Sequence, residues 1–102
     1  MKKLLIIDGQ GGQIGSQLIK SIVNYNVEIM AVGTNATATN AMMKVGAKYG
    51  ATGENPVIVG CRKADIIIGP IGIVIADSLY GEITPAMAIA VGQSPAKKYW
   101  FL

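Results

Sequence analysis

Residues 3–17 read KLLIIDGQGGQIGSQ, and this stretch decides the fold. Its first part, residues 3–7, is a short continuous apolar run, which predicts a strand buried on both faces of a parallel sheet. Four glycines follow within the seven residues 9–15. From Gln13 onward the apolar side chains recur at helical spacing, so we expect the chain to turn through the glycines directly into a helix.

The same alternation of strand and helix continues along the chain. Runs of apolar or β-branched residues predict four more strands, at residues 27–33, 47–53, 65–70 and 97–102. N-cap residues and prolines mark the starts of three helices, at Thr34 or Asn35, at Asn55 with Pro56, and at Thr84 with Pro85. Residues 71–80 fit neither pattern and are compatible with a lid, a hairpin or an arm that dimerises.

This order of elements predicts an α/β fold. Strands that alternate with amphipathic helices form a parallel sheet with right-handed crossovers and helices on both faces. We therefore expect a Rossmann-like doubly wound parallel sheet of about five strands in the order 3-2-1-4-5. The length of 102 residues predicts a single domain, residues 1–102.

Composition narrows the classes of partner. The chain is 51% hydrophobic and 15% charged, which is apolar for its size, so a homo-oligomer is expected. The net charge of +3 comes without a basic run interleaved with aromatic residues, and we expect no nucleic-acid partner. The longest apolar run, residues 66–76, contains glycine and proline and is about half a membrane span. A cytoplasmic protein with no membrane partner is expected.

Two residue types are scarce. Cys61 is the lone cysteine, and the chain has no histidine. A disulfide framework, a Cys/His zinc site and catalysis by an imidazole base are therefore excluded, and no metal is expected.

The glycine turn is the candidate binding site. Ligands of doubly wound sheets bind beyond the carboxyl ends of the strands where the strand order reverses, and this turn is expected there. Glycines let backbone N–H groups approach a phosphate, and the first helical turn adds unpaired donors and partial positive charge. We therefore expect a phosphate-bearing small molecule at a loop made of Gly9, Gln10, Gly11, Gly12, Gln13, Ile14 and Gly15. The alternative is a tight turn that only packs the helix against the strand.

The spacing of the glycines points to a nucleotide. Gly9, Gly12 and Gly15 form a G-x-x-G-x-x-G pattern, which resembles the nucleotide-binding loop of extended and atypical short-chain dehydrogenases. A G-x-G-x-x-G pattern that starts at Gly9 does not fit, because Ile14 stands where it needs glycine. A P-loop is excluded, since no Gly-Lys-Ser/Thr follows.

Residues at other strand ends are expected to line the same rim. Thr34 and Asn35 follow the second strand, where an NAD site usually has an acidic residue for the ribose. Because no acid stands there, the pattern slightly favours NADP over NAD, with a mononucleotide or a sugar phosphate as the alternative. Thr52 follows the third strand, and Gly69 and Pro70 follow the fourth. Capping of the next helix is the competing role of Thr34, Asn35 and Thr52.

No catalytic residue is assigned. The Tyr-x-x-x-Lys pair of short-chain dehydrogenases is absent, because none of the four tyrosines has a lysine four positions later. Asp8 and Glu54 are the acid/base groups on the rim, joined by Asp77 and Glu82 if residues 71–80 fold over it. A buried Asp8 with a raised pKa would suit a general base, but bonding to N–H groups of the turn is the favoured role. Glu82 is expected to be solvated or to cap a helix.

Six stretches together resemble one known family. They are IDGQGGQIG, GTNATATNAM, GATGEN, KADIIIGPIGIV, GEITPAMA and SPAKK, and they are similar to those of small bacterial proteins known only as a domain of unknown function. The resemblance covers nearly the full length. It implies a Rossmann-like single domain, and it carries no activity and no catalytic residues.

Three functions fit these features. The favoured one is a small nucleotide- or dinucleotide-binding protein that holds a phosphate at residues 9–15. The second is an enzyme whose active site is completed across a homodimer, because 102 residues leave no room for a separate substrate domain. The third is a ligand-free interaction module that uses residues 66–75 and the terminal residues 99–102 as its contact surface.

Overall fold

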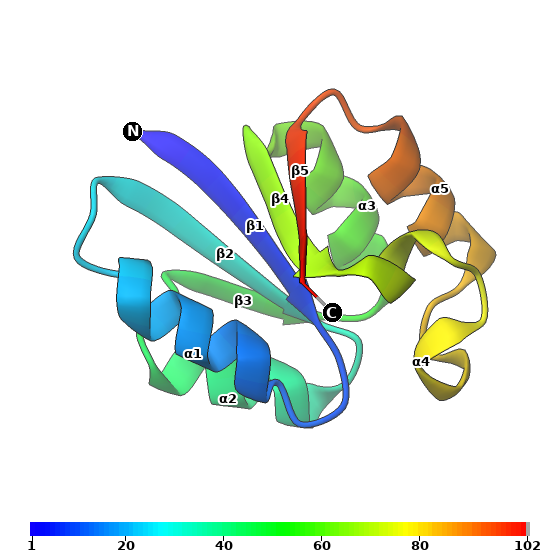
Figure 1. Cartoon of the computed structure of the whole chain (residues 1–102), viewed down its shortest axis with the longest axis horizontal. Coiled ribbons are helices and arrows are strands. Elements are labelled where there is room, and N and C mark those ends of the chain that lie inside the picture. The colour runs from blue at the N-terminus through cyan, green and yellow to red at the C-terminus, as the bar shows by residue number, and fades with distance from the viewer. Residues whose placement is uncertain (102) are drawn as a thin grey trace.

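The computed structural model describes residues 1–101 and contains one sheet of five strands, in the order β3-β2-β1-β4-β5 (Figure 1). The strands are β1 (Lys2–Asp8), β2 (Val27–Gly33), β3 (Tyr49–Thr52), β4 (Ile66–Pro70) and β5 (Lys97–Phe101). All four pairings between neighbouring strands are parallel, as helical crossovers require. The predicted strand order is confirmed; Leu102, which was expected in the last strand, lies outside the described residues.

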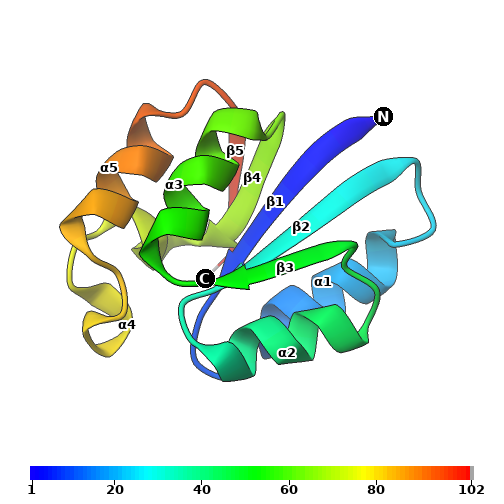
Figure 2. The same ribbon diagram turned by 180° about the vertical axis from the view of Figure 1, so that it is seen from behind.

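Helices cover both faces of the sheet, so the fold is a doubly wound α/β fold as predicted (Figures 1 and 2). One face carries α1 (Gln13–Ile22) and α2 (Ala36–Lys44), and the other carries α3 (Glu54–Lys63) and α5 (Pro85–Gln93). Between β4 and α5 the chain forms a 3-10 turn, η1 (Ile71–Val74), and one helical turn, α4 (Ser78–Gly81). Within residues 1–101 no helix has the length and apolar character needed to cross a membrane.

The central strand β1 sends alternate side chains into two separate cores. Leu5 and Ile7 pack in the core beneath α3 and α5, whereas Ile6 packs in the core beneath α1 and α2. Each of these three side chains is at most 1% exposed. Full burial of one such side chain contributes about 1.5–3 kcal/mol, and a strand buried on both faces must be apolar throughout. This explains the continuous apolar run that opens the chain.

Two predicted helix caps are confirmed. The side-chain oxygen of Asn35 accepts a hydrogen bond from the Ala38 amide (2.8 Å) at the start of α2. Thr84 caps α5 in the same way, and Pro85 is the first residue of that helix. Capping by such side chains satisfies an N–H group that has no partner inside the helix.

The predicted start of α3 is wrong by two residues. Asn55 was expected to cap the helix, but α3 begins at Glu54, and its N-cap is Gly53 with φ of +100°. Glycine adopts this conformation without steric strain, so the chain can enter the helix before Asn55. Pro56 then occupies the third helical position, where its missing N–H would have no partner inside the helix.

Candidate functional site

The glycine turn joins β1 to α1 at the carboxyl end of the central strand. β1 pairs with β2 on one side and with β4 on the other, so the strand order reverses at this strand. The turn therefore lies where doubly wound sheets bind their ligands. The Thr34 amide donates a hydrogen bond to the Asp8 carbonyl oxygen (2.9 Å), which brings the end of β2 alongside the turn.

The Asp8 carboxylate holds the turn in shape. Its Oδ1 accepts a hydrogen bond from the Gly9 amide and its Oδ2 one from the Gly15 amide, both at 2.8 Å. Burial raises the pKa of Asp8 above its usual value, and the hydrogen bonds from Gly15 and Gly9 oppose that rise. Both oxygens are occupied and the residue is 7% exposed, so Asp8 is placed to fix the backbone rather than to take a proton from a ligand.

Packing within the protein accounts for two of the loop glycines. Gly12 has φ of +70°, and a Cβ atom there would lie 2.8 Å from the backbone Cα and O atoms of Ala38 in α2. At Gly15 a Cβ would lie 2.9 Å from the Asp8 carboxylate and from the sulfur of Met42. These two glycines let α1 approach β1 and α2 closely, which is the alternative that the sequence left open.

Gly9 is also closely packed, whereas Gly11 has room for a side chain. A Cβ at Gly9 would lie 2.8 Å from the Thr34 hydroxyl and 3.0 Å from Leu79, so packing also explains this glycine. At Gly11 the nearest atom would be a Gln13 side-chain carbon at 3.9 Å, which is ordinary contact. The φ of Gly11 is not positive either, so an L side chain fits its backbone. Nothing in the described chain requires glycine at position 11.

The part of the loop that stays open is formed by Gly11, Gln13 and Ile14. Their amides have no hydrogen-bond acceptor among residues 1–101, and no acidic side chain lies in the first turn of α1. They border a cavity of about 300 Å³ that is lined by residues 8–14. Free N–H groups at a helix start carry partial positive charge, which attracts anions. The backbone here can therefore bind an anion without any cationic side chain.

A second cavity of about 200 Å³ shares four lining residues with the first and extends it toward β4 and β5. Its lining consists of Asp8, Gly9, Gln10, Ile14, Pro70, Leu79 and Phe101. Pro70 is thus brought to the loop as the sequence predicted. In the part of the chain that the structure describes, no three His, Cys, Asp or Glu side chains gather closely enough to hold a metal ion.

The predicted rim residues Thr34 and Asn35 do not line the cavities, and neither do Gly69 and Thr52. The direction in which a Gly69 side chain would point is filled by Ile73 and by the carbonyl oxygen of Ile7, at 2.7 and 2.8 Å. The Thr52 hydroxyl shares a hydrogen bond with that of Thr39 (2.7 Å) and thereby links β3 to α2. Gly69 and Thr52 serve packing at the strand ends.

Glu82 was expected at this rim only if residues 71–80 fold over it, and then as a solvated or helix-capping side chain; its carboxylate lies directly beside the glycine turn. Its Oε1 accepts hydrogen bonds from the Thr34 hydroxyl (2.6 Å) and the Gln10 amide (3.3 Å), and its Oε2 accepts one from the Asn35 side-chain amide (2.9 Å). The bond from Thr34, helped by those from Asn35 and Gln10, holds the pKa of Glu82 below its usual value, although partial burial opposes this. An ionised carboxylate therefore stands at the end of β2, where the sequence has only Thr34 and Asn35.

Glu82 reaches this place because the chain before it folds back over the turn. We call residues 75–83 the strap. Inside it, Asp77, Leu79 and Tyr80 have φ of +69°, +54° and +56°, and the Asp77 amide donates to the Ile83 carbonyl oxygen (2.7 Å). Left-handed backbone at a non-glycine residue costs about 1–2 kcal/mol. Of the three arrangements proposed for residues 71–80, the hairpin is wrong, because none of these residues forms a strand.

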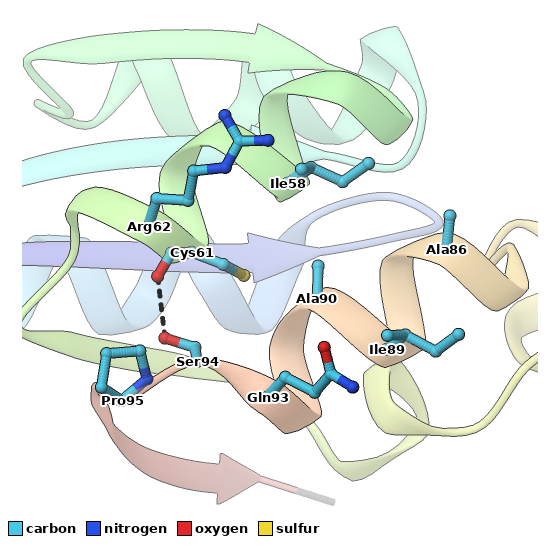
Figure 3. Close-up of a pocket in the computed structure, with 9 residues that line it drawn as sticks. All are labelled: Ile58, Cys61, Arg62, Ala86, Ile89, Ala90, Gln93, Ser94 and Pro95. Atoms are coloured by element: carbon cyan, nitrogen blue, oxygen red, sulfur yellow. Dashed lines mark hydrogen bonds between the residues drawn. The ribbon is translucent and has the colours of Figure 1, made fainter.

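Two larger cavities lie away from the turn. One, of about 430 Å³, lies between α3 and α5 (Figure 3). The Ser94 hydroxyl there donates to the Cys61 carbonyl oxygen (2.8 Å), and burial raises the pKa of the Cys61 thiol to about 11, so it stays protonated. This groove is mainly apolar and offers no reactive group.

The other, of about 460 Å³, lies at the amino ends of the strands, where Lys3, Glu28 and Tyr49 contribute to its lining. Glu28 forms an ion pair with Lys48 (3.8 Å). Ligand sites of doubly wound sheets lie at the opposite ends of the strands. The smaller cavities at the glycine turn are therefore the better candidate despite their size.

Fold and site define a small doubly wound α/β protein with a glycine turn that presents free amides at its switch point. The family model described as "Domain of unknown function (DUF3842)" matches residues 3–101, so the chain belongs to this family. The resemblance of the six sequence stretches to a domain of unknown function is thereby confirmed. No curated protein matches the chain.

Proposed function

We propose that this protein binds a nucleotide or a dinucleotide, and that the loop of residues 9–15 holds its phosphate. The observation that supports this most strongly is the set of three free amides, at Gly11, Gln13 and Ile14, beside a cavity at the switch point. Phosphate oxygens accept hydrogen bonds from such N–H groups, and the dipole of α1 adds to the attraction. Gly11 lets the phosphate approach the main chain, which gives a reason for a glycine that packing leaves unexplained.

The size of the cavities limits how much of the ligand is enclosed. Together they reach the lower end of the range for small-molecule pockets, which is about 300–1,000 Å³. This fits a phosphate and an adjoining ribose, while the remainder of NADP or NAD would extend along the surface. A mononucleotide such as AMP fits the same description. Asp8 and Glu82 lie close to the loop and weaken the attraction for an anion, so we expect modest affinity.

Two further features belong to this proposal. The high apolar content, 51% of the residues, favours a homo-oligomer, and the lone Cys61 fits a cytoplasmic protein. The absence of a basic run in the sequence argues against nucleic acid as partner. We assign no catalytic residue and propose no reaction, since both oxygens of Asp8 already accept hydrogen bonds.

The interaction module is the second candidate, and exposed aromatic residues on β5 favour it. Tyr99 is 53% exposed and Trp100 is 38% exposed on a strand that pairs only with β4 among the described strands. An unpaired strand edge can add a strand from a partner. If this candidate is right, Trp100→Ala abolishes capture of the partner and changes at the glycine turn leave it intact.

Gly11→Ala tests the nucleotide-binding proposal. The added methyl group has room in the free protein but lies where a phosphate would approach the backbone, so we expect at least a tenfold loss of affinity for NAD, NADP or AMP, whichever binds the wild type. Gly92→Ala in α5 is the matched control, because a Cβ there meets no atom within 4 Å, just as the nearest atom to a Cβ at Gly11 is in ordinary contact at 3.9 Å, and because Gly92 is far from the loop in the sequence. Affinities are measured by calorimetry with ligand up to millimolar concentration. The proposal fails if the wild type binds none of the three, or if Gly11→Ala binds as tightly as Gly92→Ala.

A further inference from the structure

We propose that Glu82 recognises the ribose of the bound nucleotide and selects ligands whose 2′-hydroxyl is free over ligands that carry a 2′-phosphate. This inference rests on the proposed function and goes further, since it names the class of nucleotide. It replaces the slight preference for NADP that the sequence alone suggests.

The position of the carboxylate is the first argument. Dinucleotide-binding doubly wound domains hold an acidic side chain at the end of the second strand, where it hydrogen-bonds the ribose hydroxyls. Here β2 ends at Gly33 and is followed by Thr34 and Asn35. Glu82, which is 48 positions from Thr34 in the chain, places its carboxylate against both of these side chains. The strap thus supplies from a distant segment the acid that the sequence after β2 lacks.

The arrangement of the hydrogen bonds is the second argument. An ionised carboxylate offers about four acceptor positions. Three are in use in Glu82, two on Oε1 and one on Oε2, so Oε2 keeps one position for a further donor. A ribose hydroxyl is such a donor. The donors from Gln10, Thr34 and Asn35 hold the carboxylate in place before any ligand arrives, which reduces the ordering that binding requires.

Glu82 and the proposed phosphate site are adjacent and do not coincide. The free amides are those of Gly11, Gln13 and Ile14, whereas Glu82 engages only the amide of Gln10 within the loop. Glu82 does not line either cavity, but it bonds to Gln10, which lines both. The inference therefore places the phosphate on the free amides and the ribose toward Glu82. If the carboxylate instead occupied the site of the phosphate itself, its removal would strengthen binding.

The charge around the site explains why a ligand with a free 2′-hydroxyl should be preferred over one with a 2′-phosphate. A phosphate on the 2′-oxygen would carry up to two negative charges toward an ionised carboxylate. Sites that accept this phosphate usually provide an arginine beside it. No lysine or arginine lines either cavity at the glycine turn, and among residues 1–101 none forms an ion pair with Glu82. The 2′-phosphate would thus meet repulsion with no compensating cation, whereas a free hydroxyl would meet an acceptor.

Two pairs of ligands and three proteins test the inference. The pairs are NAD with NADP, and AMP with adenosine 2′,5′-bisphosphate; the second pair covers the case of a mononucleotide. The proteins are the wild type, Glu82→Gln and Asp77→Asn. Glutamine keeps the size of the side chain and removes its charge, and Asp77 supplies a matched loss of charge on the same strap. Asp77 is exposed and has φ of +69°, which asparagine tolerates.

We expect the wild type to bind the 2′-hydroxyl member of a pair at least tenfold more tightly than its 2′-phosphate counterpart. Glu82→Gln should reduce this ratio to less than threefold, and Asp77→Asn should leave it unchanged. Thermal midpoints of the three proteins measured without ligand establish that each is folded. If Glu82→Gln unfolds, the affinity ratio of each ligand pair is measured on the wild type at pH 7 in low salt and in high salt. Screening by the added salt must then shrink the ratio.

Each other result overturns the inference in a distinguishable way. Binding of a nucleotide with equal or greater affinity for the 2′-phosphate member refutes the role of Glu82 and leaves the proposed function standing. Tighter binding by Glu82→Gln to every ligand shows that the carboxylate blocks the site. Absence of binding by the wild type to all four ligands refutes the inference together with the proposed function.

Discussion

Replacing Gly12 by alanine should destabilise the protein by about 2–5 kcal/mol, whereas the same change at Gly11 should be nearly neutral. Gly12 has φ of +70°, and this conformation costs about 1–2 kcal/mol for alanine. The new Cβ would also lie 2.8 Å from two backbone atoms of Ala38, so the start of α2 must shift. Overpacking of this kind costs about 1–3 kcal/mol, and the two contributions add to the stated range.

Urea denaturation followed by far-UV circular dichroism measures the free energy of unfolding of both variants. A small domain is stable by only about 5–15 kcal/mol, so the loss of stability in Gly12→Ala should clearly lower the urea concentration at the unfolding midpoint. Gly11→Ala should stay within about 0.5 kcal/mol of the wild type, because its Cβ meets no atom closer than 3.9 Å. A loss below about 1 kcal/mol at Gly12, or an equal loss at Gly11, would refute the division of the loop into packing and ligand-facing glycines.

Three further outcomes follow from single contacts. The pKa of Glu82 is lower in the folded state than in the unfolded state. Its ionised carboxylate therefore stabilises the fold above the unfolded pKa, and this contribution is lost as the pH falls through the folded pKa. Below pH 4.5 the free energy of unfolding should fall less steeply in Glu82→Gln than in the wild type. The Cys61 thiol, buried and with a pKa of about 11, should not react with a thiol reagent at pH 8 until urea unfolds the protein, and rapid reaction of the folded protein would contradict its burial. Thr84→Ala removes the cap of α5 and should lower the free energy of unfolding by about 0.5–2 kcal/mol, measured by urea denaturation; no loss would show that the cap is not needed.

The sheet could be predicted because each of its determinants is local in the sequence. The continuous apolar run of β1 identifies a strand buried on both faces, and the caps Asn35 and Thr84 fix the starts of two helices within a few residues. The start of α3 could not be predicted, because Gly53 takes a positive φ that a search for capping side chains does not detect. Local signals place elements well, and they fail where an unusual backbone conformation intervenes.

The site was harder to predict, because its essential contacts join distant segments. Sequence placed Asp8 and the glycines in one turn, but it could not separate Gly11 from Gly12, since the difference lies in φ and in the backbone of Ala38. Glu82 was expected at the rim only on condition that residues 71–80 fold over it, and its hydrogen bonds beside the turn were not predicted. The position of Glu82 depends on the strap, in which Leu79 and Tyr80 have left-handed backbone conformations. Leucine and tyrosine rarely adopt this conformation, so the sequence does not predict it.

The proposed function requires that the free backbone amides at the start of α1 bind an anion. Titration of ¹⁵N-labelled protein with NAD and with AMP, followed amide by amide in ¹⁵N–¹H correlation spectra, tests this directly. The largest and saturable shifts should occur at Gly11, Gln13 and Ile14, with smaller ones at Gln10. Spectra that do not change at millimolar ligand, or shifts confined to the groove between α3 and α5, would contradict the account.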